Sequence, residues 1–354
     1  MTFTVSIAPS GKTVSVDGDT HILEAALKQG VVLPYGCKNG ACGSCKARVL
    51  SGDIIQDSHQ PGALTDEEAR RGYALLCRAR AASDLVVEAR VVAAAGEIPI
   101  RKMPCRVSSI DRVAPDVMVI RLQLPASERL QYLPGQYVDL ILRDGTRRSY
   151  SLAAAPRTAQ GLELHVRHMP GGRFTDTAFG VVQPELKVRD ILRLEGPLGT
   201  FFLREDSPRP IVMVASGTGF APIKAILEHV QSLVESKGFS RPITLYWGGR
   251  RPHDLYMNGQ CERWAAELSS FTYVPVVSDA LPQDHWRGRT GFVHRAAMED
   301  FPDMRGCQVY ACGAPVVVDS SRADFITHGG LPADEFFADA FVTAADVAAA
   351  VEGP

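Results

Sequence analysis

The first hundred residues contain short runs in which apolar and polar positions alternate, a pattern that predicts strands. Residues 2–8 (TFTVSIA) and 13–16 (TVSV) follow it, and Pro9, Ser10 and Gly11 stand between them. Alternating runs separated by turn residues are typical of a hairpin. The chain is therefore expected to open with two paired strands.

A helix is expected next, because apolar residues recur at helical spacing between residues 17 and 30. Asp19 or Thr20 is the expected cap at its start, and Gly30 is the expected stop. The later elements of this region are a strand at 46–52 (KARVLSG), a short helix with an acidic start at 65–72 and a strand at 84–92 (DLVVEARVV).

From residue 102 onward the chain is a series of short strands separated by turn signals. Such spacing favours a small antiparallel barrel. The expected strands lie at 104–113, 116–124, 136–143, 147–153, 162–169 and 190–196.

The rhythm changes near residue 208, where buried strands begin to alternate with helices. Residues 211–216 (IVMVAS) form the first such strand, and the apolar helix 221–234 follows a glycine turn. Further buried strands are expected at 243–249, 272–278 and 307–313. This alternation predicts a parallel sheet covered by helices.

The sequence thus predicts a multidomain protein of mixed α+β and α/β class. A chain of 354 residues has room for two or three hydrophobic cores. A linker is expected between the first region and the second, because the small residues there show no amphipathic period. The expected divisions are a first domain at 1–92, the linker at 93–101, a barrel at 102–206, an α/β domain at 207–345 and a tail at 346–354.

Composition limits the partners and the cellular location that are expected for this protein. The formal net charge of −2 gives no reason to expect nucleic acid or an anionic membrane as a partner. No apolar run reaches the ~18 residues of a membrane span, and the first residues lack the pattern of a signal peptide. The cysteines at 105, 261, 307 and 312 show no disulfide spacing. A reducing cytoplasm is the expected location.

The stretch YGCKNGACGSCK is the most informative one in the first region. It spaces Cys37, Cys42 and Cys45 as C-x4-C-x2-C, and Cys77 follows later. Four thiolates in this order are the ligand spacing of plant-type [2Fe–2S] ferredoxins, whereas zinc sites usually use two short cysteine pairs. A zinc knuckle and ordinary core cysteines are the alternatives. With its strands and helix, the segment 1–92 resembles the β-grasp ferredoxin fold.

RRSYSL, at residues 147–152, is the next motif. Taken alone, a strand with Arg, Ser and Tyr is more often an ordinary half-exposed strand. Arg148, Tyr150 and Ser151, however, match the R-x-Y-S-[LF] pattern of ferredoxin reductase-like flavoproteins. PGQYVDL before it and GGRFT and GPLGTFFL after it are similar to the same family in the same order.

This resemblance implies a bound FAD, favoured over FMN because GGRFT is similar to the turn that cradles a diphosphate. An arginine fork suits a phosphate, a tyrosine ring offers a face to the flavin, and a serine hydroxyl can bond near its reactive nitrogen. The expected FAD-binding residues are Arg148, Ser149, Tyr150, Ser151, His165, Val166, Arg167, Gly171, Gly172 and Thr175, with His165 and Arg167 proposed near the adenine.

ASGTGFAP, at 215–222, follows a buried strand and opens a helix. It departs from the Rossmann fingerprint, because Pro222 stands where a third small residue is expected. It does match the G-T-G-x-A-P of the ferredoxin reductase-like family, which implies that Gly217, Thr218, Gly219 and Pro222 bind the nicotinamide coenzyme.

The resemblance also implies residues that act in the reaction. Cys312 and Gly313 match the family's C-G-x-P, where the thiol lies beside the nicotinamide. Phe341, with Phe337 as second choice, matches the aromatic ring that covers the flavin, and Ser151 completes the expected catalytic set. Each of these could instead be a core residue.

Taken together, the resemblance implies an NAD(P)H-dependent reductase that passes electrons from NADH to FAD, then to [2Fe–2S], then to a partner protein. The expected partner is the terminal component of an oxygenase. The alternative is a CDP-6-deoxy-glucoseen reductase type, which serves an iron–sulfur dehydratase in deoxysugar synthesis. A redox sensor is a third interpretation, but no helix-turn-helix or basic patch is visible.

Coenzyme choice is argued from the stretch RRPHDLY. Arg250 and Arg251 could bind the 2′-phosphate of NADPH, whereas Asp254 would oppose it. NADH is therefore expected, with NADPH less favoured.

Overall fold

The computed structural model describes residues 1–156 and 161–343, and these form two compact units. The first unit comprises Met1–Pro99, Gly199–Phe201 and the chain from Ala338 onward, and the second comprises Ile100–Leu198 and Phe202–Phe337. The predicted barrel and α/β regions therefore share one compact unit. The expected tail at 346–354 lies outside the described residues.

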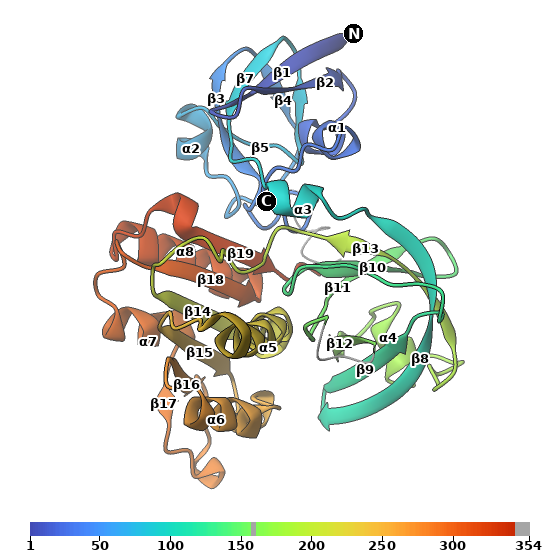
Figure 1. Cartoon of the computed structure of the whole chain (residues 1–354), viewed down its shortest axis with the longest axis vertical. Coiled ribbons are helices and arrows are strands. Elements are labelled where there is room, and N and C mark those ends of the chain that lie inside the picture. The colour runs from blue at the N-terminus through green and yellow to red at the C-terminus, as the bar shows by residue number, and fades with distance from the viewer. Residues whose placement is uncertain (157–160, 344–354) are drawn as a thin grey trace. The chain divides into compact units, whose positions relative to one another are not determined.

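The first unit is built on a five-stranded sheet with the order β2-β1-β7-β3-β5, beside a two-stranded pair, β4 and β6 (Figure 1). The strands are β1 Thr2–Ala8, β2 Lys12–Asp17, β3 Lys46–Ser51, β4 Ile54–Gln56, β5 Tyr73–Leu75, β6 Ala79–Ala81 and β7 Leu85–Glu88. The opening hairpin is confirmed, since β1 and β2 pair antiparallel. Val14 and Val16 point into the core while the residues between them stay exposed, as alternation requires.

The first helix, α1 (Ile22–Lys28), confirms the expected element but not its cap. Neither Asp19 nor Thr20 caps it, because the N-cap position is His21, which makes no side-chain cap bond. The predicted stop is correct: Gly30 has a φ of +73°, the left-handed conformation that glycine adopts without strain after a helix.

Two further short helices complete this unit. Helix α2 (Asp66–Arg70) has a capping box, in which Thr65 accepts from the Glu68 N–H and Glu68 accepts from the Thr65 N–H. Helix α3 (Ala93–Gly96) is a single turn in the segment that the sequence assigns to the linker.

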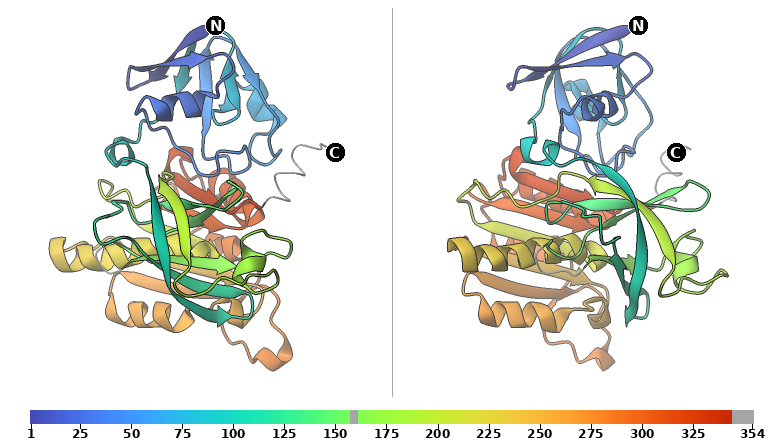
Figure 2. Two further views of the ribbon diagram at one scale, coloured as in Figure 1. Left: turned by 90° about the vertical axis from the view of Figure 1, so that its right-hand side faces the viewer. Right: turned by 45° about the vertical axis from the view of Figure 1, so that its right-hand side comes forward.

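The second unit begins with a six-stranded antiparallel sheet in the order β11-β10-β13-β8-β9-β12. Its strands are β8 Arg101–Ala114, β9 Val117–Gln123, β10 Tyr137–Ile141, β11 Arg147–Ser151, β12 Leu162–Arg167 and β13 Ile191–Leu198. Figure 2 shows β8 as a long teal arrow. The short helix α4 (Thr175–Ala178) lies between β12 and β13.

The expected barrel is confirmed as an antiparallel sheet, but its closure is partial. Among the described residues the edge strands β11 and β12 share an isolated bridge, Leu152 with Leu164. The chain leaves the sheet after this bridge because it bonds to α5 (Phe220–Lys237) instead. The Ala155 N–H donates to the Glu228 carboxylate, 2.9 Å away, and the Ala153 carbonyl accepts from the Lys224 ammonium at 3.0 Å.

A second sheet in this unit has the order β17-β16-β15-β14-β18-β19, and the pairs from β17 to β18 are parallel. Helices α5 and α6 cover one face and α7 and α8 the other (Figure 1). The central strands are buried on both faces and are mostly apolar, which confirms the predicted parallel sheet. The strands are β14 Ile211–Ser216, β15 Ile243–Gly249, β16 Phe271–Val277, β17 Arg289–Thr290, β18 Gln308–Gly313 and β19 Phe336–Ala340. The helices are α6 Asn258–Glu267, α7 Val293–Asp300 and α8 Pro315–Thr327, with short 3-10 turns η1 Gly217–Gly219, η2 Pro252–Asp254, η3 Pro282–Asp284 and η4 Ala333–Glu335.

Within the described residues, no helix has both the length and the apolar character needed to cross a bilayer.

Candidate functional site

The four predicted cluster ligands come together in the first unit as two pairs. The Cys37 and Cys42 thiols are hydrogen-bonded to each other, and so are those of Cys45 and Cys77. Cys42, Cys45 and Cys77 are buried, and Cys37 is half-buried. Two thiol pairs give a four-sulfur donor set of the kind that holds a [2Fe–2S] cluster.

The kind of metal centre is argued from the donor set. All four donors are cysteines, with three on one loop and the fourth, Cys77, next to Cys45. Zinc sites usually draw their ligands from two short cysteine pairs, whereas this order of thiols is that of plant-type [2Fe–2S] proteins. The residues present therefore fit a two-iron cluster.

The hydrogen bonds within the two pairs shift the pKa values of the thiols in opposite directions. Hydrogen bonds from Cys37 and Ser44 lower the pKa of Cys42 to about 5, although burial opposes this shift. The pKa of Cys37 is raised by its bond to Cys42 and by burial, and that of Cys45 by its bond to Cys77 and by burial. Thiolate is the form that binds metal, so Cys42 is already close to the ligand state.

Segments from distant parts of the sequence support this loop within the first unit. The Tyr35 N–H donates to the Thr200 hydroxyl at 2.9 Å, and that hydroxyl donates to the Tyr35 carbonyl at 3.0 Å. The Ser44 hydroxyl donates to the Ala338 carbonyl at 3.0 Å. These bonds hold the loop at two points, before Cys37 and between Cys42 and Cys45.

In the second unit, the flavin motif lies on β11. Strand alternation places Arg148 and Tyr150 on one face, and the Ser149 hydroxyl donates to Asp139 of β10 at 2.6 Å on the other. Ser151 is buried at the end of the strand. Arg148 and Tyr150 are half-buried, so both present surface to a ligand on their shared face.

The predicted glycine turn lies against this strand. The Phe174 ring, directly before α4, packs on Tyr150 with 5.4 Å between ring centroids. A Cβ on Gly172 would lie 2.3 Å from the Thr175 hydroxyl oxygen and 2.7 Å from the Met169 carbonyl, so this turn requires glycine. The structure therefore brings the turn and the RRSYSL strand together, as a cradle for one cofactor would need.

The predicted nicotinamide residues lie where β14 and β18 end. A Cβ on Gly219 would lie 2.2 Å from the Cys312 carbonyl oxygen, and one on Gly313 would lie 2.2 Å from the Ser216 hydroxyl. The Ala314 N–H donates to that same hydroxyl at 2.9 Å. The two loops thus meet backbone to backbone at the carboxyl edge of the parallel sheet, where ligands of open α/β sheets bind.

Pro222 occupies the first turn of α5, where a missing N–H costs nothing, as predicted. Thr218 and Cys312 are largely buried beside this turn.

The residues of β12 differ in their placement. The Arg167 guanidinium lies so close to Gly217 that a Cβ there would be 2.6 Å from its Nη1, and its other nitrogens bind Asp116 and Asp254. Val166 is buried in the barrel core. His165 has a fully buried side chain bonded to Tyr256 and Glu163. Arg167 therefore lies at the coenzyme loop, and His165 lies in a buried polar cluster.

Sequence reasoning missed the aromatic residues that support the coenzyme loop. Trp247 donates its indole N–H to the Gly217 carbonyl at 3.0 Å, stacks on Phe220 at 4.0 Å and meets the Tyr256 ring edge-on at 5.2 Å. Trp247 lies in the predicted strand 243–249 and Tyr256 in the stretch RRPHDLY, but nothing in a linear pattern indicates that they support a loop thirty or more residues away.

The two C-terminal aromatic candidates differ as well. Phe337 is half-buried and packs on Tyr310 at 4.9 Å and under the Arg204 guanidinium at 4.7 Å. Phe341 is half-buried and follows the last residue of β19. Its expected place over the flavin stays a prediction.

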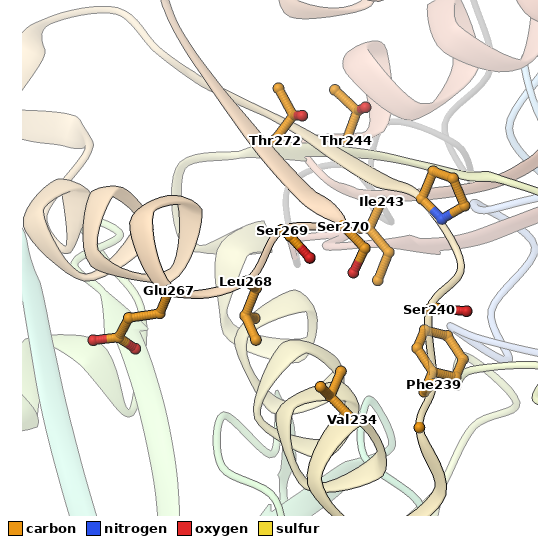
Figure 3. Close-up of a pocket in the computed structure, with 12 residues that line it drawn as sticks. Val234, Phe239, Ser240, Ile243, Thr244, Glu267, Leu268, Ser269, Ser270 and Thr272 are labelled. Carbon is orange, nitrogen blue, oxygen red and sulfur yellow. The ribbon is translucent and has the colours of Figure 1, made fainter.

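An open pocket of about 660 Å³ lies at the opposite, amino-terminal edge of the parallel sheet (Figure 3). It is lined by the end of α5 and the starts of β15 and β16, and contains none of the predicted site residues. It therefore plays no part in the coenzyme site.

Comparison with known proteins covers the chain in three consecutive matches. Residues 5–82 match the 2Fe-2S iron-sulfur cluster binding domain, 104–203 the oxidoreductase FAD-binding domain and 213–323 the oxidoreductase NAD-binding domain. The CDP-6-deoxy-L-threo-D-glycero-4-hexulose-3-dehydrase reductase of Yersinia pseudotuberculosis is 42% identical over 342 residues, 97% of this chain and 99% of its own length. The chain belongs to this family of iron–sulfur flavoprotein reductases.

Other members of the reductase family serve oxygenases. Reductase component 2 of the terephthalate 1,2-dioxygenase of Comamonas sp is 37% identical over 91% of this chain and 92% of its own length. The crystal structure of the Amycolatopsis cytochrome P450 reductase GcoB is 35% identical, with a TM-score of 0.72 over 97% of this chain and 99% of that one. The protein is thus an oxidoreductase with 2Fe-2S, FAD-binding and NAD-binding domains.

The backbone contact between the two coenzyme loops gives a direct test. In Gly219→Ala the new Cβ must displace the Cys312 carbonyl, which would lie 2.2 Å away. Because a 1 Å misplacement of reacting groups can cost ~100-fold in rate, we expect NADH-dependent dye reduction to fall by about that factor. Steady-state kinetics measures this, and cluster absorbance should be unchanged.

Gly259→Ala is the matched control, because its Cβ would meet only the Arg263 guanidinium at 3.8 Å within α6. It should keep full activity. Wild-type turnover in Gly219→Ala would show that the loop contact is not needed.

Proposed function

We propose that this reductase takes electrons from NADH through FAD and its [2Fe–2S] cluster to a partner protein. When bound, FAD accepts a hydride from NADH and releases electrons singly to the cluster. The observation that supports this order is the presence, in one chain, of paired cluster thiols, a flavin strand and a coenzyme loop.

The chain's own residues would bind and orient these groups. Cys37, Cys42, Cys45 and Cys77 would hold the irons. Arg148 would bind the FAD diphosphate, and Tyr150, fixed by Phe174, would lie along the flavin. The Gly217 loop with Arg167 would bind the coenzyme diphosphate, and Cys312 would position the nicotinamide.

Electron transfer in series predicts opposite effects for two cysteine variants. Cys45→Ser should lose the cluster signal and reduction of cytochrome c or the partner, yet keep NADH-dependent reduction of ferricyanide. Cys312→Ala should keep the cluster and FAD spectra but slow flavin reduction by ~100-fold in stopped-flow traces.

The control is Cys105→Ser, which alters a buried cysteine of the second unit away from both sites and should leave every signal intact. Loss of dye reduction together with partner reduction in Cys45→Ser, with FAD retained, would overturn the order of transfer.

The choice between NADH and NADPH depends on Asp279, the acidic residue that lies beside the Arg250 and Arg251 side chains. Arg251 pairs with Asp279 at 3.2 Å and Arg250 approaches it at 3.9 Å. Asp254 is buried and accepts the backbone N–H of both arginines, so its carboxylate holds the turn instead of facing a phosphate. Asp279 would thus repel the 2′-phosphate of NADPH and occupy the two arginines that could bind it, which supports a preference for NADH.

Removing the negative charge of Asp279 should shift the coenzyme preference toward NADPH. Asp279→Asn should raise kcat/KM for NADPH by about 5-fold, because a charge pair near the surface contributes up to about 1 kcal/mol. Glu267→Gln makes the same charge change at the opposite edge of the sheet and should not alter the ratio. A wild-type enzyme that prefers NADPH would contradict the proposal.

The acceptor we propose is the terminal component of an oxygenase, because several relatives are named as reductase components of such systems. The second candidate is an iron–sulfur dehydratase that acts on a nucleotide sugar. It is favoured by the 42% identity to the Yersinia dehydrase reductase. None of the eight cysteines, all of which lie within the described residues, forms a disulfide, and we propose a reducing cytoplasm as the setting.

Reconstitution separates the two acceptors. The reductase is combined with a purified oxygenase component or with a dehydrase, and NADH-dependent product is followed by chromatography. Product should form with only one partner, and Cys45→Ser should abolish it. Rapid direct reduction of a small molecule, with neither partner turning over, would contradict a carrier function.

A further inference from the structure

A buried chain of polar side chains joins β12 of the barrel to α5 of the parallel sheet. Lys224 on α5 forms ion pairs with Glu163 of β12 at 3.0 Å and Glu228 at 2.5 Å. Glu163 bonds to His165 Nε2 at 3.1 Å, and His165 Nδ1 bonds to the Tyr256 hydroxyl at 2.8 Å. The chain therefore runs from a helix of one sheet through a strand of the other to the turn after β15.

The protons of this chain can be assigned from its chemistry. Burial alone would raise the pKa of Glu163, but His165 and Lys224 lower it to about 2, so the group is a carboxylate that only accepts. His165 must then donate from Nε2. Burial lowers the pKa of His165, although Glu163 opposes this, so the ring is neutral and Nδ1 accepts. Tyr256 consequently donates its hydroxyl proton to His165.

The far end of the chain reaches the coenzyme loop. The Tyr256 ring meets Trp247 edge-on, and Trp247 donates to the Gly217 carbonyl at 3.0 Å. The near end reaches the same loop by another route, because Lys224 lies in the second turn of α5, which starts where η1 ends. Both ends of this chain of polar side chains are therefore connected to Gly217–Gly219.

We propose that Glu163, His165 and Tyr256 are positioning residues, which hold the Gly217 loop in register with the flavin strands without touching either cofactor. This inference rests on the proposed binding of NADH at that loop. In a merely structural role, these groups would affect only the stability of the fold, to which buried ion pairs often add little. The proposal differs because it requires coenzyme affinity to depend on a hydrogen bond remote from the coenzyme.

Tyr256→Phe is the sharpest variant, because it removes one hydroxyl and keeps the ring against Trp247. We expect the Kd for NAD⁺, measured by calorimetry on the loaded enzyme, to rise about 10-fold, the equivalent of one net hydrogen bond. Anaerobic flavin reduction by NADH should slow in the same variant. Thermal unfolding is recorded alongside.

Tyr273→Phe is the matched control, since it removes a hydroxyl that donates at 2.8 Å to Asn258 in the same unit. It should lower the unfolding temperature as Tyr256→Phe does, yet leave the Kd unchanged. Wild-type affinity in Tyr256→Phe, or an equal loss in both variants, would show that the bond is structural only.

A double variant tests whether the chain acts as a unit. If it does, His165→Phe with Tyr256→Phe should weaken NAD⁺ binding no more than the worse single variant, because both break the same link. Additive losses would overturn the proposal, and Tyr256→Phe alone decides it if His165→Phe does not fold.

The test of the positioning role can be separated from the test of the NADH preference. If the wild type binds NADP⁺ and not NAD⁺, the coenzyme preference is wrong, and the same comparison made with NADP⁺ decides the positioning role. A wild type that binds neither dinucleotide would overturn both.

Discussion

The coenzyme site depends on the close approach of two backbone loops. Gly219 and the Cys312–Gly313 pair meet with no room for a side-chain carbon on either glycine, and Ser216 bonds across the gap. A contact of this kind can form only where neighbouring parallel strands end side by side, as β14 and β18 do. The sheet order, the helix that follows β14 and the thiol at the end of β18 all follow from that meeting point.

Local patterns predicted much of this molecule. Strand β1 spans the predicted alternating run, and β14 and β15 span the predicted apolar runs, because half-buried strands alternate whereas strands buried on both faces do not. The cysteine spacing indicated a four-sulfur site by its chemistry, whereas the G-T-G turn was assigned only through its resemblance to the ferredoxin reductase-like family. The start of α1 was mispredicted because two polar residues near a helix compete as caps, and here neither serves.

Contacts across the sequence were harder to predict. His165 looked like a cofactor residue because it stands in a cofactor-like strand, whereas its partners are Glu163 and Tyr256. Asp254 was expected to oppose the 2′-phosphate of NADPH, but its carboxylate accepts the N–H groups of its own turn. Both cases concern where a side chain points, which depends on packing and not on spacing along the chain.

The first compact unit does not correspond to one continuous stretch of sequence. Thr200 and Ala338 belong to it, through their bonds with Tyr35 and Ser44 beside the cysteine loop. A gene fragment ending at the linker would therefore encode a cysteine loop that lacks the hydrogen bonds from Thr200 and Ala338. Exchange of this module between related reductases, by recombination or by design, would keep those bonds only where the recipient chain offers a hydroxyl and a carbonyl at the same two places.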